Sequence, residues 1–165
     1  LNNRTNVALM AAADSLDTKN VSVECQVLRW SLDDSEAVHN NLTGVADLCL
    51  VSDCTHFQEF HGELLWTLLR CLKVGGKIVM CHPNRGQSLQ NFLSVMDAIG
   101  IDSPDPFLIR KEWTCDTLEQ KHEEFSAQKL YVANIHCPRV FIISKLRLAT
   151  ENERLNVLAS IKARS

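Results

Sequence analysis

Hydrophobic and polar residues follow one another along this chain in blocks that predict alternating strands and helices. Two short apolar runs, Val45–Ser52 and Lys77–His82, predict strands that are buried on both faces, as in a parallel sheet. Apolar residues at three- and four-residue steps predict an amphipathic helix over Phe57–Lys73, ended by Gly75-Gly76, and a second over Ser88–Ile99.

Weaker patterns predict the elements on either side of this middle part. Strong helix formers predict a helix over Asn6–Asp14, and a period of two predicts a strand over Val21–Leu28. Further along, strands are expected over Phe107–Thr114 and Arg139–Leu146, and Thr150–Glu153 resembles a capping box that opens a final helix. This order predicts an α/β fold with helices on both faces of the sheet.

Composition narrows the class of protein. With 165 residues, 45% of them apolar and 22% charged, the chain has the balance of one globular domain and not of a disordered chain. A net charge of −3 argues against non-specific nucleic-acid binding, and no apolar run reaches the roughly 18 residues that cross a membrane. Seven cysteines without Cys-x-x-Cys spacing predict reduced core thiols in a cytoplasmic or nuclear protein, and no metal site.

Three polar or aromatic clusters follow directly after predicted strands. They are Leu28-Arg29-Trp30, Ser52-Asp53-Cys54-Thr55-His56 and His82-Pro83-Asn84-Arg85. Open α/β sheets bind their ligands past the carboxyl ends of the strands. We therefore expect the functional site to lie where these clusters meet.

The clusters, in this order, resemble the seven-strand S-adenosylmethionine-dependent methyltransferases that modify protein lysines, and most closely the calmodulin-directed members. The resemblance rests on Val27–Trp30, the strand and loop Asp47–His56, the helix and Gly-Gly turn Leu69–Met80, and His82–Phe92. It implies a Rossmann-like sheet, mostly parallel with an antiparallel last strand. Residues 1–147 would form the C-terminal two-thirds of such a domain, and residues 148–165 a C-terminal helix or tail.

The resemblance also implies a cofactor, a partner and a set of site residues. S-adenosylmethionine would be the methyl donor, and the partner would be a protein substrate, calmodulin or a similar acidic protein. The implied roles are cofactor binding for Leu28, Arg29, Trp30, Ser52 and Asp53, catalysis for Asp53 and His56, and substrate binding for Cys54, His82, Asn84 and Arg85.

These residue types suit the chemistry. A Trp face can stack on an adenine ring, a carboxylate can orient a lysine ammonium, and a His can act as a base near neutral pH. An Arg can hold an acidic peptide through charge-assisted hydrogen bonds.

Structural roles are open for the same residues. The alternatives are Trp30 closing the rim of the core, Asp53 capping the helix expected near Phe57, and surface positions for Arg29, Cys54, His56 and Arg85. Trp66 and Trp113 are expected to be packing residues, and the acidic stretch Glu112–Glu124 to be a solvated face.

The sequence departs from the family pattern in two ways, and the first of them favours a second hypothesis. The Gly-rich loop and the first strands of the family are absent from these 165 residues, and His56 stands where the family often has Tyr. The alternative is therefore a truncated or degenerate, non-catalytic binding module, and we expect these residues alone to be inactive. An exposed inner sheet edge, prone to association, is also expected.

Overall fold

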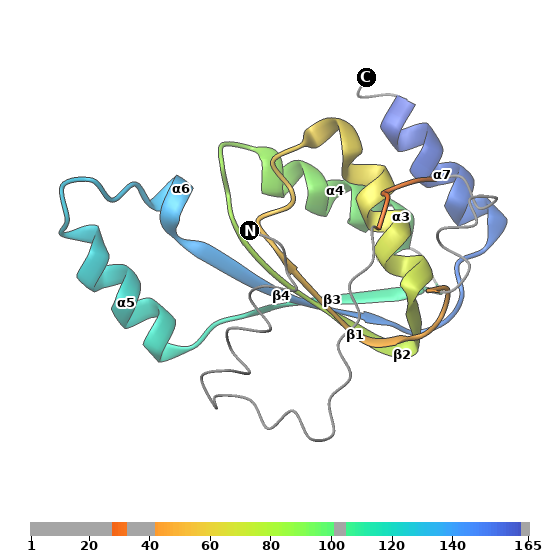
Figure 1. The fold of residues 1–165 in the computed structure, drawn as a ribbon, viewed down its shortest axis with the longest axis horizontal. Coiled ribbons are helices and arrows are strands. Elements are labelled where there is room, and N and C mark those ends of the chain that lie inside the picture. Colours follow the sequence, from red (N-terminus) through yellow and green to blue (C-terminus); the bar gives the residue numbers. More distant parts are fainter. Residues whose placement is uncertain (1–27, 33–41, 101–104, 163–165) are drawn as a thin grey trace.

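The fold was analysed in a computed structural model, which describes residues 28–32, 42–100 and 105–162. The helix predicted over Asn6–Asp14 and nearly all of the strand predicted over Val21–Leu28 lie outside the described residues. Figure 1 shows one sheet with helices above it and a helical excursion projecting to one side.

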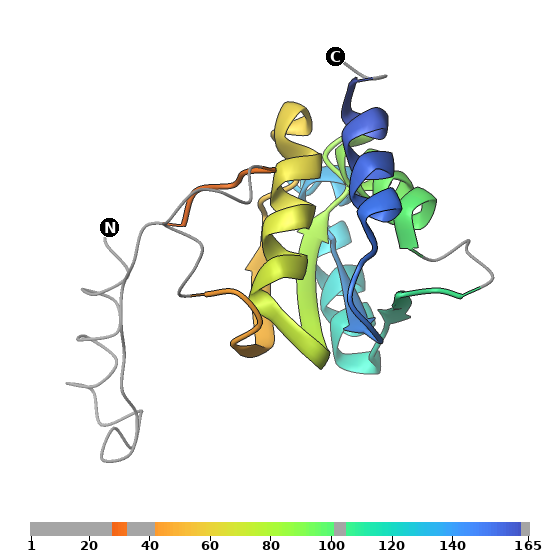
Figure 2. The ribbon, with the colours of Figure 1, turned by 90° about the vertical axis from the view of Figure 1, so that its right-hand side faces the viewer.

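A four-stranded mixed sheet organises the described residues. Its strands are β1 (Ala46–Ser52), β2 (Leu72–Pro83), β3 (Leu108–Trp113) and β4 (Pro138–Lys145). They lie in the order β1-β2-β4-β3, which Figure 2 shows from orange to teal. The β1–β2 pair is parallel, and β4 is antiparallel to both of its neighbours. The α/β class and the antiparallel last strand are therefore confirmed, as are the two later strand predictions.

Three helices cover one face of this sheet. They are α3 (His61–Cys71), which follows the short 3-10 helix η2 (Gln58–Phe60), then α4 (Ser88–Gly100) and α7 (Glu151–Lys162). All three helices contact one another, and they lie on the same side of the strands (Figure 1). Two further helices, α5 (Asp116–Ser126) and α6 (Ala133–His136), belong to the excursion between β3 and β4.

The hydrophobic core lies between the sheet and these helices. Alternate residues of β2 and β4 point into it, so that Ile78, Met80 and Ile143 are fully buried. The helices contribute Leu64, Leu65, Leu68, Leu69, Leu89, Phe92 and Met96. Trp66 is also buried, as expected for a packing residue. Burial of each such side chain contributes about 1.5–3 kcal/mol to folding.

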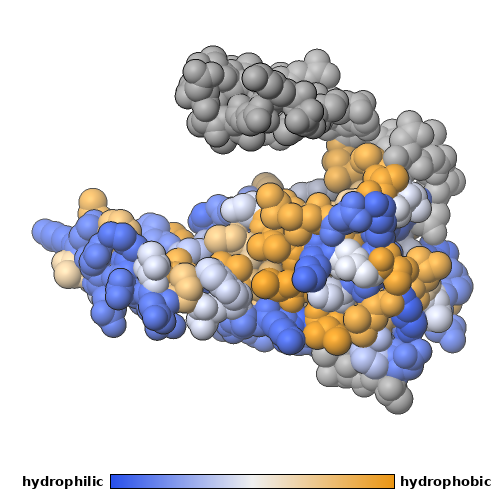
Figure 3. All heavy atoms as spheres, turned by 90° about the horizontal axis from the view of Figure 1, so that it is seen from below, coloured by the Kyte–Doolittle hydropathy of each residue, from blue (hydrophilic) through white to orange (hydrophobic). Residues whose placement is uncertain are grey.

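The opposite face of the sheet carries no helix among the described residues. On this open face Leu48 is 53% exposed and Leu50 is 76% exposed, so the prediction that β1 is buried on both faces is wrong. Half-buried Val79 and Ile142 continue the same cross-strand row, and Figure 3 shows hydrophobic side chains gathered there. An apolar run indicates a strand but does not say which of its faces is covered.

The boundary between α3 and β2 also differs from the prediction. The helix begins at His61, not Phe57, and ends at Cys71, because Leu72 is already extended. Gly75-Gly76 does not cap it and instead lies inside β2, near the shift in register with β1. The helix end is closed by Lys145, whose Nζ donates to the carbonyls of Leu69 (2.6 Å) and Leu72 (2.7 Å).

The predicted capping box at the start of α7 is confirmed. The N–H of Glu153 donates to Thr150 Oγ1 (3.3 Å), and the N–H of Thr150 donates to the Glu153 carboxylate (2.5 Å). Two orphan backbone donors are thereby satisfied. None of the described helices combines the length and hydropathy that crossing a bilayer requires.

Candidate functional site

The carboxyl ends of β1 and β2 lie side by side because these two strands are parallel. The N–H of Asp53 donates to the carbonyl of Cys81 (3.2 Å), which continues the pairing one residue beyond β1. The loop that begins at Asp53 therefore lies beside the turn that follows His82. Two of the three predicted clusters meet at this edge.

A bidentate ion pair joins the two loops. Arg85 Nε donates to Asp53 Oδ1 (2.7 Å) and Arg85 Nη2 donates to Oδ2 (2.6 Å). These hydrogen bonds hold the pKa of Asp53 below its usual value and raise the pKa of Arg85. Since both side chains are about half exposed to solvent, the pair contributes little to stability. Capping of a helix by Asp53 is not what the structure shows, because the carboxylate binds Arg85.

The backbone of the same two residues is strained. Asp53 has φ +51° and Arg85 has φ +44°, and these are the non-glycine residues with positive φ among those the structure describes. The left-handed region costs an L-residue roughly 1–2 kcal/mol. Such strain concentrates at functional sites, where the surrounding structure maintains it.

His82 supports the loop that begins at Asp53. Its ring is fully buried, and Nδ1 accepts a hydrogen bond from the N–H of Cys54 (3.2 Å). The ring proton of the neutral tautomer is thereby assigned to Nε2, which has no partner among the described residues. Burial lowers the pKa of His82 to about 4. In this structure the ring contacts the loop and not solvent.

A second buried polar group lies next to His82. The carbonyl of Thr55 accepts hydrogen bonds from His61 Nε2 (2.6 Å) and from the Ser88 hydroxyl. All three of these residues are buried. Thr55 belongs to the second predicted cluster, whereas His61 and Ser88 were not predicted as site residues; their only signal was that they are polar side chains at the starts of α3 and α4. They fasten the Asp53–Phe60 loop to both helices.

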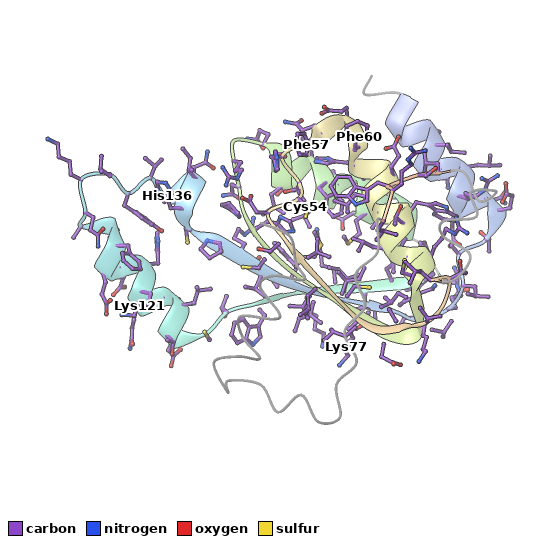
Figure 4. The ribbon with its side chains drawn as sticks, in the orientation of Figure 1. Cys54, Phe57, Phe60, Lys77, Lys121 and His136 are labelled. Atoms are coloured by element: carbon purple, nitrogen blue, oxygen red, sulfur yellow. The ribbon has the colours of Figure 1, made fainter. Side chains whose placement is uncertain are left out.

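His56 lies on the exposed side of this loop. Its Nδ1 donates to the carbonyl of Asp53 (3.1 Å), which leaves Nε2 as the basic atom of the neutral ring. The imidazole lies 3.9 Å from the ring of Phe57, centroid to centroid. Phe57 and Phe60, which the helix prediction placed in the core, are instead about half exposed on the loop (Figure 4). The loop therefore presents a base and two aromatic rings.

The other predicted residues of these two clusters form hydrogen bonds with backbone groups in or next to the two loops. The thiol of Cys54 donates to the Ser52 carbonyl (3.1 Å), and burial raises its pKa, so that it is not an activated nucleophile. Ser52 Oγ donates to the Cys81 carbonyl (3.4 Å), and the Asn84 carbonyl accepts the N–H of Leu89 (3.2 Å).

The first cluster is positioned differently. Leu28, Arg29 and Trp30 precede Ser31, whose N–H donates to Thr67 Oγ1 (3.1 Å) in the middle of α3. Trp30 is half buried and packs against the core, as the alternative of a rim-closing residue describes. This hydrogen bond ties the segment to α3. Its role towards a cofactor stays a prediction.

Comparison with known proteins identifies the class. A family model described as lysine methyltransferase matches residues 3–99, which is more than half of the chain and includes all three clusters. The chain belongs to this lysine methyltransferase family. The calmodulin-lysine N-methyltransferase of Arabidopsis thaliana is 33% identical over 82 residues, which are 48% of this chain and 26% of that protein. The aligned part therefore spans about a quarter of the relative's length.

Proposed function

We propose that the edge formed by Asp53, His56 and Arg85 is the substrate side of an S-adenosylmethionine-dependent protein-lysine N-methyltransferase. One observation carries the proposal: the family match covers the same loops that converge at the carboxyl ends of β1 and β2. Three features support a functional role for this edge: its position at the strand ends, its backbone strain, and the buried Nε2 of His82, which has no partner in the described part of the chain.

The groups at this edge fit a cationic methyl donor. A carboxylate and aromatic rings are the groups that proteins offer to sulfonium and ammonium ions. When bound, S-adenosylmethionine supplies an electrophilic methyl group. Leu28, Arg29, Trp30, Ser52 and Asp53 are the residues proposed to hold it.

The target lysine must lose a proton before its amine can accept a methyl group. A lone carboxylate would raise the pKa of the amine and oppose this loss. Because Arg85 already pairs with the Asp53 carboxylate, Asp53 can orient the amine with a weaker effect on its pKa. In this proposal His56 Nε2 accepts the proton, and Phe57, whose ring contacts the imidazole, helps to exclude water.

The proposed substrate is a protein lysine, with calmodulin as the first protein to test. Its support is the name of the relative from Arabidopsis thaliana. Cys54, His82, Asn84 and Arg85 stay as the residues proposed on the substrate side, His82 through the loop that it supports.

The test is isotope transfer by the full-length protein. It is incubated with S-adenosylmethionine carrying a labelled methyl group and with calmodulin or an unrelated lysine-rich protein, and lysine peptides are then analysed by mass spectrometry. We expect a mass increase of one labelled methyl group or more on a specific lysine. Calmodulin binding without label on any lysine would contradict catalysis and favour the binding module.

A further inference from the structure

A helical arm, residues 114–137, extends from the sheet between β3 and β4 and carries α5 and α6 (Figure 1). Figure 4 shows Lys121 on its first helix and His136 on its second. The arm is tied to the candidate site, because the N–H of Arg85 donates to the carbonyl of Asn134 (2.8 Å). A ligand that lies along the arm would therefore reach the loop that holds the ion pair.

A hollow of about 170 Å³ lies at the base of the arm, where β3 enters it and β4 leaves it. Its apolar walls include Trp113, Leu118 and Val140. Trp113, which sequence reasoning assigned to packing, is 47% exposed and so presents its indole ring to solvent. This volume is close to that of one long side chain.

The charges that line the hollow leave one carboxylate in excess. Arg139 and Glu112 neutralise each other through two hydrogen bonds of 2.7 Å, and the guanidinium also lies over the ring of Phe141. Glu119, on α5, is exposed and forms no ion pair with another described residue. With His122 counted as neutral, the lining carries a formal charge of −1.

Contacts within the arm hold the hollow open. His122, which lines it, is hydrogen-bonded through Nδ1 to Tyr131 Oη (2.5 Å). Tyr131 stacks on Phe125, with ring centroids 6.4 Å apart, and so links α5 to the connection towards α6. These contacts hold α5 in place and so fix the position from which Glu119 reaches the hollow.

We infer that this hollow binds a lysine or arginine side chain of the protein substrate, next to the lysine that is methylated. The inference rests on the proposed function. Apolar walls suit the aliphatic stem of such a side chain, the Trp113 ring suits its cationic head, and Glu119 supplies the opposite charge. An acidic side chain would be repelled by Glu119.

The sheet sets the distance between the two subsites. Trp113 lies opposite Val140, which lies opposite Cys81, which lies opposite Ser52, so three strand spacings separate Trp113 from the residue before Asp53. At ~4.8 Å per strand this is about 14 Å, and an extended peptide covers it in about four residues. The basic side chain is therefore expected about four residues from the target lysine.

The test uses the full-length protein and fluorescently labelled twelve-residue peptides with a single central lysine. Their sequences differ only in carrying Arg or Gln four residues before or after that lysine, and binding is measured by fluorescence anisotropy. We expect one of the Arg peptides to bind roughly five- to tenfold more tightly than its Gln counterpart. The preference should be lost in Glu119→Gln and kept in Glu123→Gln, which removes the same charge from the same helix outside the hollow.

Equal binding of Arg and Gln peptides by the wild type, or a preference that survives in Glu119→Gln, would overturn the inference. Methyl transfer to the Gln peptides is measured in parallel. If they are methylated while Arg gives no preference, the proposed function stands and the subsite fails. If Arg is preferred in binding but no peptide or protein is methylated, the subsite stands and the proposed function fails.

Discussion

The two ends of the β1–β2 pair carry the same kind of ion pair in different backbone settings. At the amino end Asp47 pairs with Lys73 (2.9 Å), and at the carboxyl end Asp53 pairs with Arg85 (2.6 Å). At the amino end positive φ falls on Gly44 and Gly75, where it costs little. At the carboxyl end Gly86 also has positive φ, but so do the two paired residues, Asp53 and Arg85.

A buried titratable group at each end shows the same contrast. At the amino end Lys145 donates two hydrogen bonds to the end of α3. At the carboxyl end His82 makes its hydrogen bonds through Nδ1 and leaves Nε2 without a partner among the described residues. The amino end is thus organised for stability, whereas the carboxyl end keeps strain and an unpaired polar atom, as functional sites do.

Removal of Lys145 would weaken the amino end most. Lys145→Met keeps the apolar stem but leaves the Leu69 and Leu72 carbonyls without their donor. We expect the free energy of unfolding to fall by about 2–3 kcal/mol, measured by urea denaturation at pH 7. Lys77→Met, at an exposed position of β2, is the control and should change it by less than about 0.5 kcal/mol. Equal losses in both variants would contradict the claim that the hydrogen bonds of Lys145 stabilise the amino end.

His82 makes the carboxyl end sensitive to acid. Its pKa is about 4 in the folded protein and 6.5 in the unfolded chain, so the unfolded state takes up its proton first as the pH falls. The stability that the neutral ring contributes is complete above pH 6.5 and is lost between pH 6.5 and 4. We expect a loss of about 2 kcal/mol between pH 7 and 5, measured by urea denaturation at each pH.

The variant His82→Gln removes this titration. Whatever its stability at pH 7, its free energy of unfolding should fall by about 2 kcal/mol less than that of the wild type between pH 7 and pH 5. Lys77→Met, at an exposed position of β2 and with no histidine removed, is the control and should retain the wild-type pH dependence. An unchanged slope in His82→Gln would assign the acid sensitivity to another group.

Exchange of glycine and non-glycine residues tests the strain at both ends. Gly75→Ala adds a Cβ that meets no atom within 4 Å, so its cost is that of a left-handed alanine, about 1 kcal/mol. Arg85→Gly relieves similar strain while removing an exposed ion pair, and should leave the melting temperature within a few degrees of wild type. A large loss of stability in Arg85→Gly would show that Arg85 serves the fold and not the site.

The strand-end clusters were predictable because each apolar run ends abruptly in polar residues, and parallel strands bring those ends together. The burial of His82 was also predictable, since His82 continues the alternation of the buried residues Ile78 and Met80 along β2.

The end of α3 could not be predicted from the local sequence, because the side chain that closes it, Lys145, lies more than 70 residues further along. Gly75-Gly76 predicted a helix end a few residues later, but the contact with Lys145 determines where the helix ends.

The support of the site depends on tertiary contacts in the same way. The Thr55 carbonyl meets His61 and Ser88 only after both helices pack against the loop. Likewise, Trp113 follows the pattern of a packing residue, but it lies on the edge strand β3 beside the arm and is 47% exposed.

The central claim is that the Asp53 end of β1 is the methyl-transfer site. The direct measurement is kcat/KM for lysine methylation by the full-length protein in the variants Asp53→Asn and Asp47→Asn. Each change removes one carboxylate charge. Because asparagine tolerates the left-handed conformation that Asp53 adopts, and because both ion pairs are exposed, each change should alter the free energy of unfolding by no more than about 1 kcal/mol. We expect Asp53→Asn to lower kcat/KM by a factor on the order of 100 and Asp47→Asn by less than about twofold. Equal rates in the two variants would contradict the account.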